Sequence, residues 1–456
     1  MASPLPVGEV LTRIPRGPVQ RNVLVATGTA WALAAMEVLL ISFTLPTMTA
    51  VWGLSGTAAG VLGSASLGGM VLGSPLGGRL ADSYGRLRTL QLMVAVYAVS
   101  AGLTALSGGL YSATLLRFLT GIGIGGTATA TTVYLSEHLA DGDRGRYLTY
   151  LDAFWAIGSI AAVLLAWVLL TPFAFSMPAG GFEHWRLLFV VGATPILLVP
   201  LFGRFGDSPH YLADHGRETA ARERLEAIST GNGAPLDLSA VRLVVRTADD
   251  DDAGFKQLLS PSLGRRTVVT SLAWFGTNFG FFGVFIWLPG AIGAAEFVGG
   301  TYQYLLLASV VQIPGYLSAA WLVDRVGAKR TLGGYLLLSG LGTYVFAAAL
   351  PGVGFTPLSG FWPFLFGLLA ASFFSVGAFG SLRAYTPAQF PTSLRSTGSG
   401  VAEGTGRIAG ILGPIVAGSL VGSGYLLALA PLAVGFALAG VLVFVFGSDA
   451  DEFVSA

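Results

Sequence analysis

The chain has no cysteine, and only 4 of its 456 residues are histidine. Without cysteine there can be no disulfide, thiolate metal site or cysteine nucleophile, and no two histidines have the spacing of a metal-ligand pair. Charged residues are also scarce, at 11% of the chain against roughly 25% in an ordinary soluble domain. So few charges cannot cover the surface of a soluble protein of this size. We therefore expect lipid around much of the chain, and no metal or nucleophile chemistry.

The chain has instead many long apolar runs. A membrane-spanning helix needs about 20 mainly apolar residues, and by this measure the sequence predicts twelve spanning helices. Their limits are 23–51, 57–79, 89–107, 110–135, 147–170, 185–203, 267–290, 302–323, 331–350, 360–384, 396–421 and 425–447. A polar segment, 204–266, separates the sixth span from the seventh and contains the acidic run Asp249–Asp252. We expect a cytoplasmic linker with short helices there, with the acidic run in solvent.

The 25 Lys and Arg residues are distributed unevenly along the chain. Arg117 and Arg407 fall inside predicted spans, Arg383 falls near the end of one, and Arg186 alone maps to the outside. The other 21 fall in segments that a twelve-span topology places in the cytoplasm. Because positive charge concentrates on the cytoplasmic side, we expect residues 1–22 and 448–456 to be cytoplasmic ends of an inner-membrane or plasma-membrane protein.

An internal repeat divides the spans into two halves. RLADSYGRLRTL (Arg79–Leu90) aligns with WLVDRVGAKRTL (Trp321–Leu332) at a constant offset of 242 residues. We therefore predict an all-α membrane protein of two pseudo-symmetric six-helix bundles, residues 23–203 and 267–447. In parallel repeats of this kind the substrate binds at the midplane between the halves, which rock against each other.

The same loop carries a resemblance to a known family. GGRLADSYGRLRTL resembles the signature of the major facilitator superfamily between its second and third spans. Four further stretches resemble signatures of its sugar-porter-like and organic-ion branches: RFLTGIGIGG (Arg117–Gly126), YLSEHLADGDRGR (Tyr134–Arg146), DSPHYL (Asp207–Leu212) and QFPTSLRSTG (Gln389–Gly398). The N-terminal stretch VLTRIPRGPVQRNVLVATGTAWALAAMEVLLISFTLP looks most like the bacterial niacin-type and aromatic-acid porters. Those often carry a second acid three residues before Glu37, where this chain has Ala34.

The resemblance implies a cytoplasmic gate built from loop charges, which clasp neighbouring helices in one conformer and separate in the other. The residues concerned are Asp82, Gly85, Arg86, Arg88, Glu137, Arg144 and Arg146 in the first half, and Asp324, Gly327, Arg330 and Arg395 in the second. Asp207 and Gln389 stand where those branches commonly have Glu, so we expect a weaker charge network around Arg395. The simpler reading is that these basic loops only set the topology, and both readings can hold together.

Glu37 is the sole charge in the run from Val23 to Val51, although a charge at the bilayer centre costs about 2.5–3.5 kcal/mol. In proton-coupled sugar symporters a first-span acid pairs with the arginine of the fourth-span motif, which is Arg117 here. The resemblance therefore implies that Glu37 loads a proton outside and releases it inside as this pair opens. The alternative is a static ion pair that fixes helix packing. We expect both residues to lie beside the central cavity.

Arg407 is the residue that bears most on the substrate. RIAGILGP resembles a segment of organic-ion transporters in which cation carriers have an acid and anion carriers a base at this place. A guanidinium in a dry cavity favours a carboxylate ligand, which it can bind through two hydrogen bonds. Alternatively, Glu403 lies one turn earlier and could neutralise Arg407 as an i,i+4 partner.

Other spans add candidates for the binding site. The aromatic segment WFGTNFGFFGVFIWLP (Trp274–Pro289) contains Asn278, and rings such as Trp274 and Phe282 would suit a flat substrate, although most must face lipid or other helices. Asp152 in the fifth span either lines the cavity or pairs with Arg146 or another base near the membrane surface. Arg383 is expected to extend from a helix end toward water.

We therefore expect a secondary transporter and not an enzyme, with no cofactor and the proton as coupling ion. We expect it to take up a small organic anion by proton symport, with an aromatic carboxylate such as nicotinate as the candidate substrate. The expected partners are this substrate and membrane lipid; no nucleic acid is expected, and the protein would be a monomer. The alternatives are a sugar or drug transporter of the same superfamily, and a non-transporting membrane sensor with the same fold.

Overall fold

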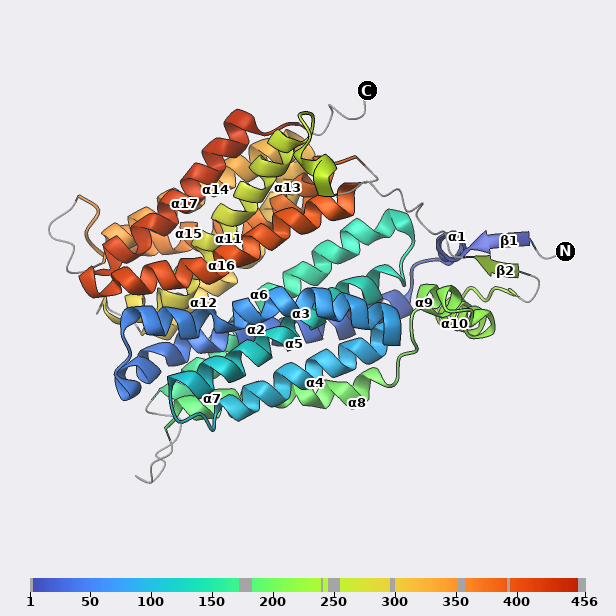
Figure 1. Ribbon diagram of the computed structural model, residues 1–456, viewed down its shortest axis with the longest axis horizontal. Coiled ribbons are helices and arrows are strands. Elements are labelled where there is room, and N and C mark those ends of the chain that lie inside the picture. Colours follow the sequence, from blue (N-terminus) through green and yellow to red (C-terminus); the bar gives the residue numbers. More distant parts are fainter. Residues whose placement is uncertain are drawn as a thin grey trace.

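The computed structural model describes residues 3–171, 183–238, 241–244, 255–295, 300–350, 357–391 and 394–449. The acidic run Asp249–Asp252 lies outside these residues. Within them the fold is almost entirely helical, with one pair of short strands. Two groups of helices lie side by side and diverge toward one end (Figure 1), the first drawn in blue and green and the second in yellow to red.

The first bundle holds the six spans predicted for residues 23–203. Its elements are α2 (Pro18–Trp52), α3 (Gly56–Tyr84), α4 (Arg86–Thr104), α5 (Leu110–Ser136), α6 (Asp141–Leu170), α7 (Trp185–Gly192), η1 (Thr194–Leu197) and α8 (Leu198–Phe202). The sixth span is broken after Gly192 because Pro195 has no backbone N–H to continue the α-helical bonding. Gly53 ends α2 in the left-handed conformation, at φ 58°.

The second bundle contains α11 (Gly264–Gly293), α12 (Thr301–Val310), α13 (Gln312–Val326), α14 (Ala328–Ala348), α15 (Phe361–Ala388), α16 (Arg395–Leu420), η4 (Val421–Ser423) and α17 (Tyr425–Phe446). The eighth span is broken between α12 and α13, where Pro314 cannot donate to Val310. In the described part of the chain, eleven spans are long and apolar enough to cross a membrane. The remaining predicted span, α5, is rich in Gly and Thr and packs inside its bundle.

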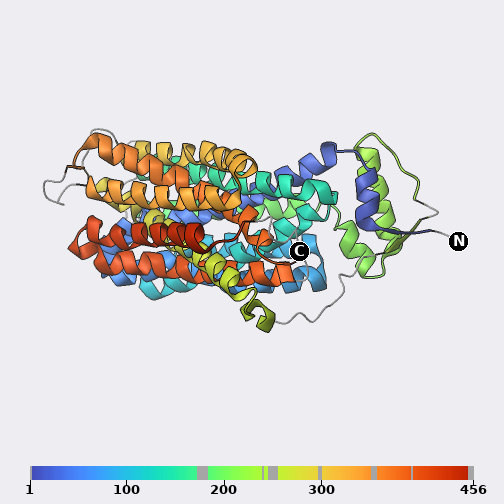
Figure 2. The ribbon, with the colours of Figure 1, turned by 90° about the horizontal axis from the view of Figure 1, so that it is seen from above.

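A small domain projects from one end of the bundles, as Figure 2 shows at its right. It contains α1 (Val7–Arg13), α9 (Pro209–Asp214) and α10 (Glu218–Gly231), and strand β1 (Ser3–Pro6) pairs in parallel with β2 (Val241–Val244). Apolar side chains of the N-terminal segment, from Leu5 to Val19, share a core with α9 and α10. We call this end of the molecule the α10 end.

Asn232 fastens the small domain to the start of α2. Its Nδ2 donates to the carbonyl oxygen of Pro15 at 2.9 Å, and its Oδ1 accepts from the backbone N–H of Val19 at 3.1 Å. Arg16 adds an ion pair with Asp143, at the start of α6, through an Nε–Oδ2 bond of 2.8 Å. A short helix, η2 (Phe255–Leu259), precedes α11.

The two bundles touch most closely where α3 meets α16. A Cβ on Gly56 would lie 2.1 Å from the carbonyl oxygen of Gly418, and one on Gly60 would lie 2.6 Å from that of Pro414. Only glycine allows two backbones to approach so closely. Trp287 of α11 donates to the same Pro414 oxygen at 2.9 Å. These contacts belong to the start of α3 and the end of α16, at the end of the molecule opposite the α10 end.

Candidate functional site

A cavity of about 150 Å³ lies between the bundles. Its charged lining is Asp152 of α6, Arg383 of α15, and Glu403 and Arg407 of α16. Aromatic rings surround these charges, contributed by both bundles: Trp31, Trp155, Trp274, Phe281, Phe282, Tyr316 and Phe379. The cavity therefore combines flat apolar surfaces with two positive and two negative side chains.

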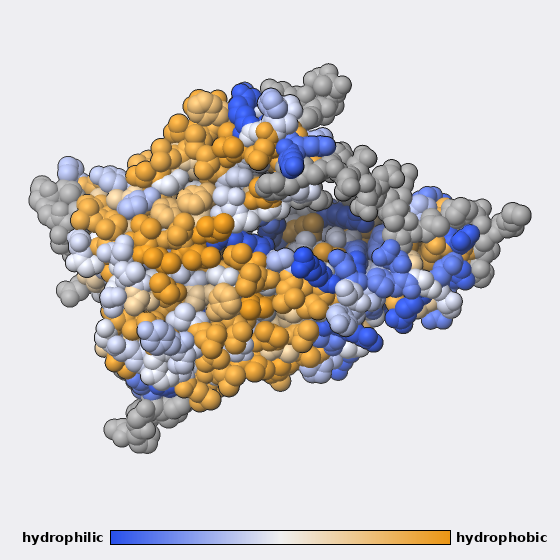
Figure 3. Space-filling view, viewed as in Figure 1, coloured by the Kyte–Doolittle hydropathy of each residue, from blue (hydrophilic) through white to orange (hydrophobic). Residues whose placement is uncertain are grey.

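The cavity is reached from the α10 end through a wider vestibule of about 790 Å³. Asp152, Trp274, Tyr316, Arg383 and Glu403 line both spaces, so they mark the neck between them. The space-filling view shows the divergence as a hollow between the bundles, bordered by hydrophilic residues (Figure 3).

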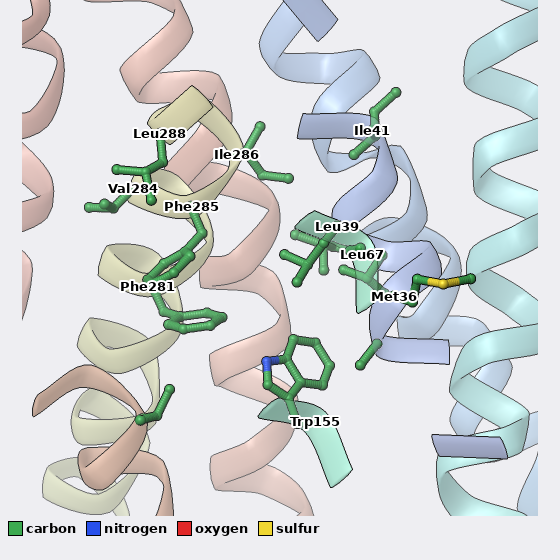
Figure 4. Close-up of a cluster of buried hydrophobic side chains, with 14 of the residues drawn as sticks. Met36, Leu39, Ile41, Leu67, Trp155, Phe281, Val284, Phe285, Ile286 and Leu288 are labelled. Atoms are coloured by element: carbon green, nitrogen blue, oxygen red, sulfur yellow. The ribbon is translucent and has the colours of Figure 1, made fainter. Parts of the chain in front are cut away.

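Apolar side chains close the cavity on its other side. In Figure 4, Leu39 and Leu67 of the first bundle face Phe285 and Ile286 of α11, with Trp155 beside them. The ring of Trp155 lies 6.3 Å from that of Phe281 and 6.4 Å from that of Phe282. A further hollow of about 650 Å³ at the opposite end does not share lining residues with the cavity.

Arg407 extends into the cavity from α16. Its Nη1 donates to the carbonyl oxygen of Met70, on α3, at 3.3 Å. Glu403 also lines the cavity, but among the described residues no carboxylate lies within salt-bridge distance of Arg407. The i,i+4 ion pair considered from the sequence is therefore not formed, and most of the guanidinium donors are available to a ligand.

Asp152 forms an ion pair with Arg383, a residue that was not predicted to belong to the site. The Nε of Arg383 lies 2.6 Å from Asp152 Oδ2. Asp152 thus lines the cavity and pairs with a base other than Arg146, which instead donates to the hydroxyl of Tyr150 at 2.6 Å. Arg383 was expected to extend toward water from a helix end, but it faces the cavity and joins the two bundles.

The three candidates from the seventh span all line the cavity. Trp274 donates through Nε1 to the hydroxyl of Thr386 at 2.8 Å, and Asn278 donates to the carbonyl oxygen of Trp274 at 2.9 Å. These bonds fix the orientation of the indole and the amide, while Phe282 is left to pack against Trp155 of the other bundle.

Several aromatic residues of the cavity were not predicted from the sequence: Trp31, Tyr316, Phe379 and Trp155. Trp155 could have been found, because it lies three residues after Asp152 and so shares its helix face. Trp31 lies six residues before Glu37, on a different face of α2. No local pattern distinguishes Tyr316 or Phe379 from the many other aromatic residues.

Glu37 and Arg117 form an ion pair inside the first bundle, and both side chains are completely buried. Arg117 also donates through Nη2 to the carbonyl oxygen of Glu37 at 2.7 Å, and its guanidinium lies 5.3 Å from the ring centre of Phe189. A Cβ at Gly192 would lie 2.3 Å from Glu37 Oε2, so only glycine lets α7 approach the pair. The expectation that this pair lies beside the central cavity is wrong, because neither residue lines it.

The loop charges of the first half form a tight network at the α10 end. Arg86 makes three hydrogen bonds of 3.0–3.1 Å to the carboxylate of Glu137 and one ion pair of 3.3 Å with Asp82. Its backbone N–H donates to Asp207 Oδ1 at 3.1 Å. Gly85 precedes it with φ 105°, and a Cβ there would lie 2.2 Å from Asp207 Oδ2.

The remaining loop residues lie outside this network. Arg88 is exposed, and Arg144 donates to the carbonyl oxygen of Ser136 at 3.1 Å. In the second half, Asp324, Arg330 and Arg395 are all exposed and make no ion pair within the described residues. Gly327, at φ 89°, repeats the backbone of Gly85 without a carboxylate beside it.

Comparisons with known proteins agree with this architecture. A family model described as "Sugar (and other) transporter" matches residues 29–448. The niacin transporter NiaP of Acinetobacter baylyi is 32% identical over 409 residues, which cover 89% of this chain and 88% of that protein. The putative niacin/nicotinamide transporter NiaP of Bacillus subtilis is 30% identical over 402 residues, or 88% of each chain.

Solved structures share the fold at low identity. The partially occluded inward-open form of the xylose transporter XylE from E. coli has a TM-score of 0.73 and 17% identity, with 94% of this chain and 99% of that chain covered. The spanning helices and the cavity between the bundles are those of an integral membrane transporter. Since the family model matches nearly the whole chain, this protein belongs to the sugar (and other) transporter family of the major facilitator superfamily and is not an enzyme.

Proposed function

We propose that the protein takes up a small organic anion, an aromatic carboxylate such as nicotinate, together with protons. The observation that carries this proposal is Arg407, a cavity arginine without a carboxylate partner among the described residues. A carboxylate ligand would satisfy its free donors through paired, charge-assisted hydrogen bonds. Relatives named as niacin transporters support the same class of substrate.

The aromatic lining supports a flat ring in the substrate. Trp274 and Phe282 from the second bundle lie across the cavity from Trp31 and Trp155 of the first. Rings stacked on such surfaces contribute binding free energy beyond simple burial. Asn278 and the four charges would then fix the orientation of the polar groups.

In this proposal the protein lies in the inner membrane, the α10 end is its cytoplasmic side, and both termini are cytoplasmic. The basic residues of the small domain and of the loops around Arg86 and Arg330 lie at this end, as the positive-inside rule requires. The vestibule then opens to the cytoplasm, and the structure is the inward-facing conformer of a monomer.

Proton coupling is assigned to the Glu37–Arg117 pair. Glu37 Oε2 makes no hydrogen bond within the described residues, although it is buried. A proton on this oxygen would neutralise Glu37 and weaken its hold on Arg117, so that α2 and α5 could shift against each other. Because the pair lies outside the cavity, its effect on the substrate would be conformational and not a direct contact.

Uptake into proteoliposomes tests the function. With an acidic outside medium, we expect wild-type protein to accumulate radiolabelled nicotinate and to lose this activity when a protonophore removes the gradient. Arg407→Gln should weaken nicotinate binding about tenfold or more, because charged hydrogen bonds are lost, whereas Arg407→Lys should retain part of it. Accumulation of xylose or a cationic drug in place of carboxylates would overturn the proposal.

A further inference from the structure

The Asp152–Arg383 ion pair lies where the cavity meets the vestibule. Both residues line both spaces. Asp152 belongs to α6 and Arg383 to α15, so their 2.6 Å bond crosses from one bundle to the other. Among the described residues it is the sole salt bridge between the bundles.

The ion pair with Asp152 occupies only part of the guanidinium group of Arg383. A guanidinium has five N–H donors, and the ion-pair contact with Asp152 is made through Nε. The side chain of Arg383 is 49% exposed and that of Asp152 21% exposed, although both lie deep between the helices. Arg383 therefore holds Asp152 while its outer nitrogens face open space.

The charged groups around the pair are balanced. Glu403 and Arg407 of α16 line the same cavity, and Tyr316 of α13 lines it beside Arg383. The other ionisable residues that line the vestibule are Arg146 and Tyr150 of α6 and Asp324 of α13. With the four cavity charges ionised, Arg383 and Arg407 offset Asp152 and Glu403, so an incoming anion must compete with a resident carboxylate for an arginine.

We propose that the Asp152–Arg383 pair is a charge-selective inner gate, at which the carboxylate of the substrate displaces Asp152 from Arg383 on its way to the vestibule. Arg407 would bind the carboxylate in the cavity, and Arg383 would be its second binding site on the exit path. A neutral analogue of the same shape cannot compete with Asp152 and so does not open the gate. The existence of a gate is inferred from the position of the ion pair alone. Its selectivity for anions rests on the proposed function.

The gate can be tested without any ligand, because the chain has no cysteine of its own. Ala128→Cys places a thiol in the cavity, and Ser399→Cys places one in the vestibule. In purified protein, Asp152→Asn and Arg383→Gln should each raise the labelling rate of the cavity thiol by a water-soluble thiol reagent about tenfold. Labelling of the vestibule thiol should not change.

Control variants separate the gate from general loosening. Asp152→Glu and Arg383→Lys keep both charges and should label like the wild type. The gate is overturned if the cavity thiol labels at the wild-type rate in both charge-removing variants, or if the vestibule thiol speeds up equally.

A second measurement tests selectivity with two ligands that share a ring, nicotinate and nicotinamide. By calorimetry, Arg383→Gln should weaken nicotinate binding about tenfold and Asp152→Asn should strengthen it, with nicotinamide unchanged in both. Equal effects on the two ligands would overturn the charge filter. If wild-type protein bound no carboxylate at all, the proposed function would fail, while the labelling rates would still decide the gate.

Discussion

The two bundles share a repeated loop but use their charges in different ways. In the first bundle, Arg86 binds Glu137 and Asp82, and the buried Glu37–Arg117 pair lies within the same six helices. In the second bundle, Ala328 occupies the position of the repeat that matches Arg86, and Arg330 is exposed like its counterpart Arg88. The charges that face the cavity are those of Arg383, Glu403 and Arg407.

This difference separates two roles. Charges satisfied inside one bundle hold that bundle together and can report a conformational change. Charges on the cavity surface, such as those of Arg407 and Glu403, are available to a ligand. We therefore expect charge changes in the first half to alter coupling and stability, and changes at the cavity to alter ligand affinity.

Replacing Glu37 with Gln should give the largest effect. The amide keeps the size of the side chain and can still accept from Arg117, but it cannot take up and release a proton. We expect gradient-driven accumulation of nicotinate in proteoliposomes to be abolished, while exchange of labelled for unlabelled nicotinate continues. Calorimetry should give an unchanged affinity for nicotinate.

Arg407→Gln is the matched comparison for Glu37→Gln. It should reduce affinity and exchange together, because the lost group contacts the ligand directly. If Glu37→Gln also lost nicotinate binding while remaining folded, the separation of coupling from binding would be wrong.

Arg86→Ala and Arg330→Ala compare a paired arginine of the first loop copy with an exposed arginine of the second. Arg330 aligns with Arg88, and the second copy has Ala328 where the first has Arg86. Removing Arg86 leaves Glu137 without its partner and should destabilise the protein by about 2–3 kcal/mol. Removing Arg330, which is exposed and makes no ion pair within the described residues, should change stability by less than about 0.5 kcal/mol. Thermal unfolding in detergent measures both. Equal losses in the two variants would contradict the stabilising role assigned to the contact between Arg86 and Glu137.

The loop glycines allow a finer comparison. Gly85 and Gly327 both have positive φ, so alanine is strained at either position, by about 1–2 kcal/mol. At Gly85 the new Cβ must also displace the Asp207 carboxylate, whereas at Gly327 it meets open space. Gly85→Ala should therefore lower the unfolding temperature more than Gly327→Ala does. An equal decrease would mean that Asp207 moves aside at no cost.

Much of the fold was predictable from local patterns. Apolar length set the twelve spans, and the duplicated Asp-Gly-Arg loop set the two halves, because both signals are contained within short stretches of sequence. The pairing of Glu37 with Arg117 was predicted from the family resemblance. The position of that pair relative to the cavity was not, since it depends on how α2 is rotated about its axis.

Contacts between distant segments were harder to predict. Asp152 and Arg383 are 231 positions apart, and a nearer base, Arg146, lay only six residues from Asp152. Residues 3–14 pack on α9 and α10 through apolar side chains. The local sequence pattern of this segment does not indicate that contact. In both cases the deciding contact is tertiary, and no local period reports it.

The smallest expected difference between the halves concerns the pH dependence of stability, and it comes from residues at the ends of α5 and α15. His138, just beyond α5, is fully buried, and its Nδ1 donates to the carbonyl oxygen of Tyr134 at 2.7 Å. Burial lowers the pKa of His138 to about 3 from an ordinary value of 6.5, with Arg224 and His210 acting in the same direction. At the end of α15 the C-cap residue Gln389 is buried, and its amide does not titrate.

The lowered pKa of His138 determines whether stability rises or falls with pH. Above pH 6.5 the imidazole is neutral in both the folded and the unfolded chain, so it does not affect their balance. Between pH 6.5 and 3 only the unfolded chain takes up the proton, so stability decreases as the pH falls, by about 1 kcal/mol between pH 7 and 5.5. His138→Asn keeps a donor for Tyr134 but cannot titrate, so its unfolding temperature should fall less over this range. Gln389→Glu would add an ionisable carboxyl at the end of α15 and should give the second half a pH response of its own. Identical pH profiles for wild type and His138→Asn would show that His138 is not the group responsible.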